Sequence, residues 1–309
     1  MSHAACQSPY ADALPWVTHY PAGVAWNMPI EPAPLPAILD RAVAAYGGQT
    51  AIRFKGKSTT YRDLGQQVER LAAALQDIGV VKGTKIGILL PNTPAFIAYF
   101  YAILKIGGTV VNFNPLYTVE ELTFQVQDSQ TEFMVTHDLA ALFPKVEALI
   151  ATGVLKRAII EPFADALPFA KKHLFKIFKA KDRAHPARSA VKDRLIDGAA
   201  LRLHGGLLKP VPIDPKEDVA VLQYTGGTTG TPKGAMLTHA NLYANTVQIA
   251  TWAHDLVDGG ERVLGALPLF HVFAMTGVMN LGIEKGATII LMPRFQLQEA
   301  LELIHSEKP

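Results

Sequence analysis

The segment Val219-Ala-Val-Leu-Gln-Tyr-Thr-Gly-Gly-Thr-Thr-Gly-Thr-Pro-Lys-Gly234 is the most informative stretch of the chain. Its first part, Val219 to Tyr224, predicts a strand that enters a loop rich in glycine and threonine. Gly226, Gly227 and Gly230 permit positive φ angles and let backbone N–H groups approach a ligand closely. Successive N–H groups in such a loop form a concavity that binds anions. The segment therefore predicts a strand followed by a phosphate-binding loop.

The side chains of this loop suit a di- or triphosphate. Lys233 adds a positive charge, and Pro232 stiffens the loop before it. The Walker A motif is excluded, because it requires Gly-Lys-Ser/Thr and Lys233 lies between Pro232 and Gly234. The dinucleotide fingerprint Gly-x-Gly-x-x-Gly is also missing. A loop that only turns the chain is the alternative. The hydroxyl donors of the loop are Thr225, Thr228, Thr229 and Thr231.

The rest of the chain alternates short β-branched runs with amphipathic stretches, which predicts an α/β fold with mostly parallel sheets flanked by helices. Thr60, Thr93 and Thr118 are expected to cap helices, Thr93 before a proline at the first helical position and Thr118 through a capping box with Glu121. Further strands are expected at 85–90, 109–113, 133–136, 157–160, 262–267 and 287–292. Further helices are expected at 61–78, from Pro94 to about Gly107, and at 240–253, 271–281 and 297–306.

The composition describes an ordinary globular chain. Of 309 residues, 49% are hydrophobic and 18% are charged, so a packed core is expected. The net charge of +2 gives no general reason to expect binding to nucleic acid. Cys6 is the single cysteine and cannot form an internal disulfide, which fits a reducing compartment. The N-terminus lacks the features of a signal peptide, and the apolar run 95–104 is too short to span a bilayer. We expect a cytoplasmic protein, soluble or peripheral at the inner face of the membrane.

The segment 171–194 is strongly basic, with Asp182 and Asp193 as its acidic residues. If 167–181 is helical, the apolar residues Leu167, Leu174, Phe175 and Phe178 fall near one face. A basic amphipathic helix of this kind can lie on an anionic membrane surface, which predicts peripheral membrane contact through 167–194. A solvated insert whose aromatic residues pack on the domain is the alternative.

The loop, together with Ala235-Met-Leu-Thr-His239 after it, resembles the signature of the adenylate-forming (AMP-binding) superfamily. This superfamily includes acyl-CoA synthetases, firefly luciferase and the adenylation domains of peptide synthetases. Within it, the chain is most similar to bacterial long-chain-fatty-acid–CoA ligases. Further segments that resemble the family are Thr59-Thr-Tyr-Arg-Asp-Leu64, Ile86-Gly-Ile-Leu-Leu-Pro-Asn92, Val111-Asn-Phe-Asn-Pro-Leu-Tyr117 and Leu267-Pro-Leu-Phe-His-Val-Phe-Ala-Met275.

The resemblance implies a reaction in two steps. The carboxylate of a long-chain fatty acid attacks the α-phosphorus of ATP, which gives acyl-AMP and pyrophosphate. The thiol of coenzyme A then displaces AMP. The implied ligands are therefore ATP, Mg²⁺, coenzyme A and a fatty acid.

The resemblance also assigns roles to individual residues. His271 and Lys233 are the expected catalytic residues, and Thr225 is the expected Mg²⁺ contact. A hydrogen-bonded histidine at a helix start is the alternative for His271, and His239 is expected to be structural. The expected ATP-binding set is Thr225, Gly226, Gly227, Thr228, Thr229, Gly230, Thr231 and Lys233. The expected acyl-binding set, whose apolar members suit a core position equally well, is Phe270, His271, Phe273 and Met275.

Three parts are expected along the chain: an extended arm over 1–36, a first α/β subdomain over 37–210 with a basic insert at 165–195, and the start of a second α/β subdomain over 211–309 that carries the phosphate loop. A C-terminal domain is expected to be absent. The family's adenine loop and a catalytic lysine would follow residue 309. We therefore expect a truncated chain that is inactive alone. Exposed strand edges in such a chain would favour a homodimer.

Three other functions remain open: a ligase for aryl or short acids, an adenylation domain that loads a carrier protein, and a non-catalytic module that binds nucleotide or acyl groups.

Overall fold

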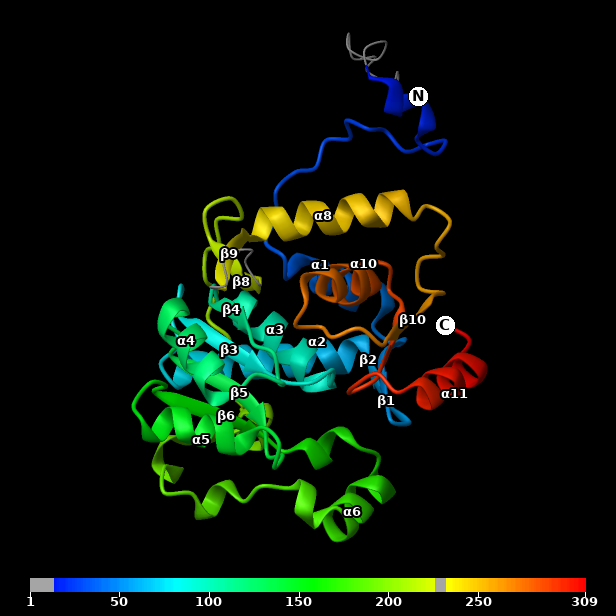
Figure 1. Cartoon of the computed structure of the whole chain (residues 1–309). Helices are drawn as coiled ribbons and strands as arrows, with labels where there is room; N and C mark the ends of the chain where they lie inside the picture. Colours follow the sequence, from blue (N-terminus) through cyan, green and yellow to red (C-terminus); the bar gives the residue numbers. More distant parts are fainter. Residues whose placement is uncertain (1–13, 226–231) are drawn as a thin grey trace.

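The computed structural model describes residues 14–225 and 232–309 and confirms the predicted α/β fold (Figure 1). Two mostly parallel sheets are flanked by helices. A seven-stranded sheet has the order β7-β6-β5-β3-β4-β8-β9, and a four-stranded sheet has the order β10-β11-β1-β2.

The larger sheet is parallel except for its last strand. Its strands are β3 (Lys85–Leu89), β4 (Thr109–Asn112), β5 (Phe133–His137), β6 (Arg157–Glu161), β7 (Leu195–Asp197), β8 (Val219–Thr225) and the antiparallel β9 (Lys233–Thr238). Helices α4 (Val119–Ser129) and α5 (Phe143–Ala151) share one apolar cluster with this sheet. Helices α2 (Tyr61–Asp77) and α3 (Pro94–Lys105) belong to the second, larger cluster. Helices therefore cover both faces, as parallel sheets require.

The smaller sheet joins residues from the two ends of the described chain. Strand β1 (Thr50–Phe54) pairs with β11 (Thr288–Leu291) in parallel and with β2 (Lys57–Thr60) in antiparallel, and β10 (Arg262–Gly265) pairs with β11 in parallel. Around it lie α1 (Ala37–Tyr46), α8 (His239–Trp252) and α10 (Leu281–Glu284), and α11 (Leu297–Glu307) follows β11.

Sheet membership does not follow the boundary expected at residue 210. Strands β8 and β9 complete the sheet that begins with β3, whereas β1 and β2 belong with β10 and β11. The chain therefore begins in the smaller sheet, builds the larger sheet from β3 to β9, and returns to the smaller sheet with β10 and β11. Pairing between distant segments is not encoded in local periodicity, which is why the sequence alone placed the division elsewhere.

The predicted helix caps are confirmed at two of three positions. Thr60 and Thr118 each form a capping box, with Asp63 and Glu121. Thr93 lies at the N-cap of α3, but its side chain makes no capping hydrogen bond. Its hydroxyl lies instead 3.0 Å from Nε2 of the buried His137, a partner at the end of β5.

The single helix expected over 271–281 is irregular. A short α9 (Val272–Ala274) leads into a π-helical segment, Met275–Asn280, before α10 begins. Gly277 lies within the π-helical segment, and glycine has one of the lowest helix propensities. π-helical turns inside helices are frequent at functional sites.

The basic segment contains α6 (Phe169–Phe178) and short 3₁₀ turns, and α7 (Gly198–Arg202) follows β7. No helix in the described part of the chain combines the length and the apolar character needed to cross a membrane.

Gly87 in the middle of β3 gives a test of core packing. A Cβ atom there would meet Cε2 of Phe113 at 2.7 Å and Cε of Met134 at 3.3 Å. We expect Gly87→Ala to lower the free energy of unfolding by about 1–3 kcal/mol, because overpacking forces neighbours out of position. Urea denaturation measures the change. The control is Gly277→Ala, where a Cβ atom meets nothing within 4 Å, and an equal loss in both variants would contradict the packing argument.

Candidate functional site

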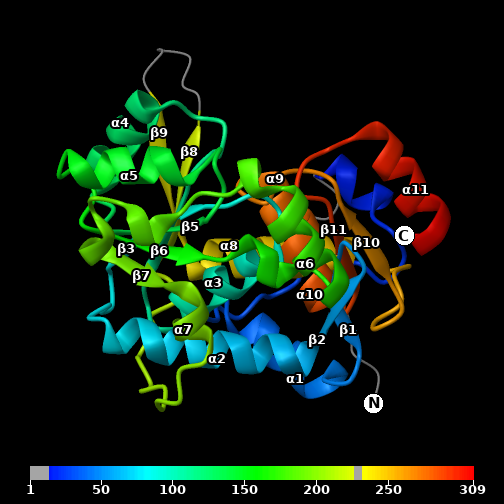
Figure 2. The same cartoon turned by 90° about the horizontal axis from the view of Figure 1, so that it is seen from below.

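The base of the predicted phosphate loop is a pair of neighbouring residues. Thr225 ends β8, Lys233 begins β9, and the two are register partners in the antiparallel ladder. Both residues are exposed, and the ladder pairs the end of β8 with the start of β9 beside the loop (Figure 2). The remaining predicted loop residues, 226–231, lie outside the described residues.

The position after Lys233 has little room for a side chain, which favours glycine at residue 234. A Cβ atom at this position would lie 3.0 Å from Cζ of Tyr224, its partner across the ladder. The Tyr224 hydroxyl donates a hydrogen bond to Asp128 of α4. Burial, followed by the nearby Asp128 carboxylate, raises the pKa of Tyr224, which keeps the phenol neutral. The base of the loop is thereby fastened to a helix that covers the larger sheet.

The predicted acyl-binding residues differ in their surroundings. Phe270 is half-buried against the main core, and its ring centroid lies 4.5 Å from that of His271. His271 is exposed at the start of α9, and its side chain makes no capping hydrogen bond. Phe273 is 70% exposed, whereas Met275 is fully buried within the core. His271 is therefore available to a ligand, and Met275 packs inside the protein.

A buried amide network connects the phosphate-loop strand to this segment. Gln223 Nε2 donates to the carbonyl oxygen of Phe270 at 3.1 Å, and Gln223 Oε1 accepts from Asn112 Nδ2 at 3.0 Å. Asn112 Nδ2 also lies 3.6 Å from the sulfur of Met275. Gln223 precedes Thr225 by two residues, and Phe270 is adjacent to His271. The network therefore places Thr225 and His271 at the same edge of the larger sheet.

A second buried amide, Asn92, holds the chain that leads to His271. Its Nδ2 donates to the carbonyl oxygens of Gly265 and Leu267 at 3.1 and 2.8 Å. Its Oδ1 accepts from the backbone N–H of Leu269 at 2.8 Å. Sequence reasoning assigned no role to Asn92, Asn112 or Gln223. The available signal was an amide side chain at or close to the end of each of three apolar strands, where a buried polar group requires partners.

His239, expected to be structural, is buried at the start of α8, and its Nδ1 accepts a hydrogen bond from the backbone N–H of Leu35 at 3.1 Å. Burial lowers the pKa of His239 from 6.5 to about 4 and outweighs the opposing effect of Asp218. The neutral imidazole thus connects the segment before α1 to the base of α8.

A further polar cluster lies at the carboxyl ends of β5 and β6 and was not predicted. The Glu161 carboxylate lies 2.6 Å from Nε of Arg202 and accepts from the hydroxyl of Tyr99 at 3.0 Å. Burial raises the pKa of Glu161 to about 7. His137 Nδ1 lies 2.8 Å from the carbonyl oxygen of Glu161, and burial lowers the pKa of His137 to about 4. None of the predicted site residues contributes a side chain to these contacts.

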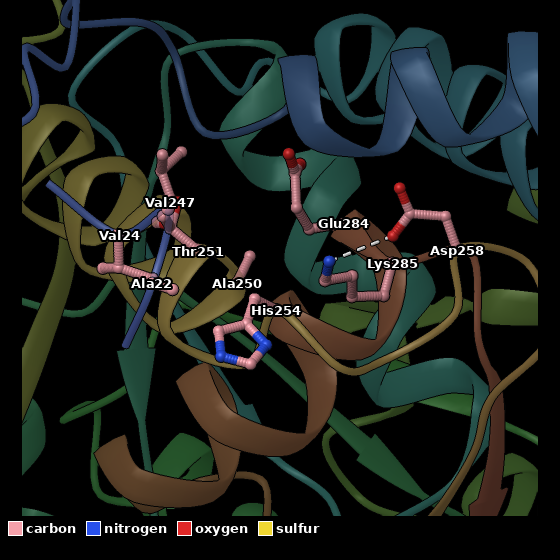
Figure 3. A pocket seen from close by; sticks show the side chains of 10 residues that line it. Ala22, Val24, Val247, Ala250, Thr251, His254, Asp258, Glu284 and Lys285 are labelled. Carbon is pink, nitrogen blue, oxygen red and sulfur yellow. Dashed lines mark hydrogen bonds and ion pairs between the residues drawn. The ribbon is translucent and has the colours of Figure 1, made fainter. Parts of the chain in front are cut away.

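The cavity in Figure 3 is also separate from the predicted site. Its volume is about 410 Å³, and it is lined by the N-terminal segment, α8 and the end of α10. Asp258 and Lys285 form an ion pair of 3.0 Å at its wall. None of the predicted ATP- or acyl-binding residues that the structure describes lines it.

Asn92→Ala tests the amide that holds the chain before His271. We expect the free energy of unfolding to fall by about 3 kcal/mol, because three hydrogen bonds are lost and buried partners remain unsatisfied. Urea denaturation and amide hydrogen exchange measure the effect, and the Leu269 amide should exchange faster. The control is Asn245→Ala at an exposed position of α8. Unchanged exchange at Leu269 would show that Asn92 does not hold this segment.

His239→Gln tests the neutral buried imidazole. Between pH 6.5 and about 4 the unfolded chain binds a proton at His239 and the folded chain does not, so stability falls as the pH falls through this window. The variant should lose this component, which amounts to about 1.4 kcal/mol per pH unit within the window. Denaturation curves across the range compare the slopes. His305→Gln on α11 is the control, and equal slopes in the wild type and His239→Gln would contradict the assignment.

Comparison with known proteins agrees with this architecture. A family model described as "AMP-binding enzyme" matches residues 39–309. A long-chain-fatty-acid–CoA ligase of Bacillus subtilis is 39% identical over 296 residues, which cover 96% of this chain and 52% of that protein. A ligase with the same description from Escherichia coli O157:H7 is 36% identical over 286 residues, 90% of this chain and 50% of that protein.

A solved structure of a long-chain-fatty-acid–CoA ligase from Archaeoglobus fulgidus matches with a TM-score of 0.73 and 26% identity. The match covers 94% of this chain and 52% of that one. The chain therefore spans about half the length of the relatives that it matches. The match over most of the chain leads to one conclusion: this protein belongs to the AMP-binding enzyme family.

Proposed function

We propose that the chain forms the first part of an ATP-dependent ligase that converts a long-chain fatty acid to acyl-AMP and then to acyl-CoA. The observation that carries the proposal is the joint placement of Thr225, Lys233 and His271 at one edge of the larger sheet through Gln223. The descriptions of the most similar relatives support the choice of substrate. Because these relatives are about twice as long, we assign the complete reaction to a protein of their length and expect residues 1–309 alone to be inactive.

In the first step, a carboxylate oxygen forms a bond to the α-phosphorus of ATP while the bond to the pyrophosphate oxygen breaks. Negative charge then increases on the β- and γ-phosphates. The ammonium group of Lys233 would stabilise that charge, and the exposed His271 would donate a hydrogen bond beside the reacting carboxylate and α-phosphate. In the second step, the sulfur of coenzyme A forms a thioester and AMP leaves.

Mg²⁺ and the phosphate chain fit the residues at the base of the loop. In residues 14–225 and 232–309, no group of three or more His, Cys, Asp or Glu side chains is arranged to hold a metal ion. Mg²⁺ bound to nucleotides commonly takes most of its ligands from phosphates and water, so a single hydroxyl such as that of Thr225 is a suitable protein contact. When bound, Mg²⁺ would neutralise charge on the phosphates.

Lys233→Ala tests the proposal by acid-dependent exchange of pyrophosphate into ATP. The assay uses the protein encoded by the complete reading frame, with the 309-residue chain alone beside it. We expect exchange with long-chain acids and a loss of about 100-fold or more in Lys233→Ala, because one preorganised charge at the phosphates is removed. Lys216→Ala, at an exposed position before β8, is the matched control.

The panel of acids separates the remaining functions. Exchange with aryl or short acids but not with long-chain acids would assign a different ligase, and transfer to a carrier protein would assign a loading domain. ATP binding without exchange for any acid would favour a non-catalytic binding module. Exchange by the 309-residue chain alone, at the rate of the longer protein, would contradict the expectation that it is inactive.

A further inference from the structure

Helix α6 lies on the outside of the molecule and is anchored along one side only. It lies at the lower edge of Figure 1 and in front of the other elements in Figure 2, which views the molecule from below. The ring of Phe175 packs against Phe163, with centroids 5.2 Å apart. Lys172 forms an ion pair of 2.7 Å with Asp165, and Lys171 Nζ donates to the carbonyl oxygen of Lys55 at 2.8 Å. These contacts fix the orientation of the helix.

The opposite side of α6 presents apolar side chains to solvent. Phe169, Leu174, Ile177 and Phe178 are 79, 52, 68 and 76% exposed. With Ala170 and His173 they cover about half of the helix circumference at 3.6 residues per turn, and no charged residue lies among them. This face, called here the α6 apolar face, differs from the expected one, because Leu167 and Phe175 point into the protein.

The charge around the α6 apolar face is almost entirely positive. The sequence has no acidic residue from Phe169 to Lys181. From there to Arg194 its two acidic residues are Asp182 and Asp193. Asp182 lies 3.6 Å from the exposed Lys179, a pair that contributes little in water. Among the side chains of this segment that the structure describes, the exposed cations are Lys171, Lys179, Lys181, Arg188, Lys192 and Arg194.

We propose that the α6 apolar face docks onto a membrane surface rich in anionic lipid. A helix with large apolar side chains on its outer face and lysines at its margins lies in the plane of the lipid headgroups, with the apolar face at the acyl boundary. Basic residues beside it are attracted by the negative surface potential of the membrane. The charge complementarity favours anionic lipid over a second copy of this chain, because two copies would bring the same cations together. The proposal does not depend on the proposed ligase function.

Co-sedimentation with vesicles tests this surface in the absence of nucleotide. We expect the chain to bind vesicles of phosphatidylcholine with phosphatidylglycerol, to bind poorly to phosphatidylcholine alone, and to be released by salt. The double variant Ile177→Glu/Phe178→Glu should partition about tenfold less onto the anionic vesicles. Leu207→Glu is the matched control, because Leu207 is 90% exposed but lies outside the basic segment.

A second variant, Lys179→Ala/Lys181→Ala, leaves the α6 apolar face intact. It should weaken binding to the anionic vesicles and leave the poor binding to phosphatidylcholine vesicles unchanged. Thermal unfolding of each variant shows whether it remains folded. Failure of the wild type to bind anionic vesicles at low salt, or unchanged binding by a folded Ile177→Glu/Phe178→Glu variant, would overturn the proposal. A dimer in sedimentation velocity that this variant dissociates, without vesicle binding, would assign the face to a second copy instead.

Discussion

The burial of α3 on every side is the constraint on which the two-sheet arrangement depends. All residues from Ala95 to Leu104 are buried, and a helix that is apolar around its whole circumference must be covered on all sides. One side packs on the larger sheet and another on α2. The hydroxyl of Tyr101 reaches the π-helical segment, where it donates to Asn280 Oδ1 at 2.9 Å. The helix thereby brings the segment after His271 against the sheet that carries the phosphate loop.

The candidate site is then positioned by polar groups that this packing buries. Gln223 and Asn92 connect strands of the larger sheet to the backbone on either side of Leu269. An unpaired buried amide is costly, so these bonds restrict the backbone to one arrangement. The residues that would touch ATP or the acid, Lys233 and His271, are exposed and contribute little to the fold. Positioning and chemistry are thus divided between buried and exposed side chains.

The polar cluster around Glu161 has a similar role at the carboxyl ends of β5 and β6. Arg202 lies between Glu161 and Asp165, and Asp165 pairs with Lys172 of α6. The outward orientation of the α6 apolar face therefore depends on contacts that begin inside the larger sheet. Both the site and the proposed membrane surface are held by buried polar groups near carboxyl ends of parallel strands.

The sequence by itself determined the features that depend on neighbouring residues. The helix caps at Thr60 and Thr118, most strands and the family of the chain followed from short patterns, because these depend on local hydrogen bonding and side-chain periodicity. The phosphate-binding chemistry of the glycine–threonine loop stays a prediction, because most of the loop lies outside the described residues.

Only the tertiary structure decided features that depend on distant residues. It assigned β8 and β9 to the larger sheet, gave the Thr93 hydroxyl a partner in β5, and turned Phe175 of α6 inward. It also revealed Asn92, Asn112 and Gln223 as the groups that position the candidate site. The physical reason is that a buried amide or aromatic ring takes its role from the partner that packing supplies, and the partner here is often more than 100 residues away in the sequence.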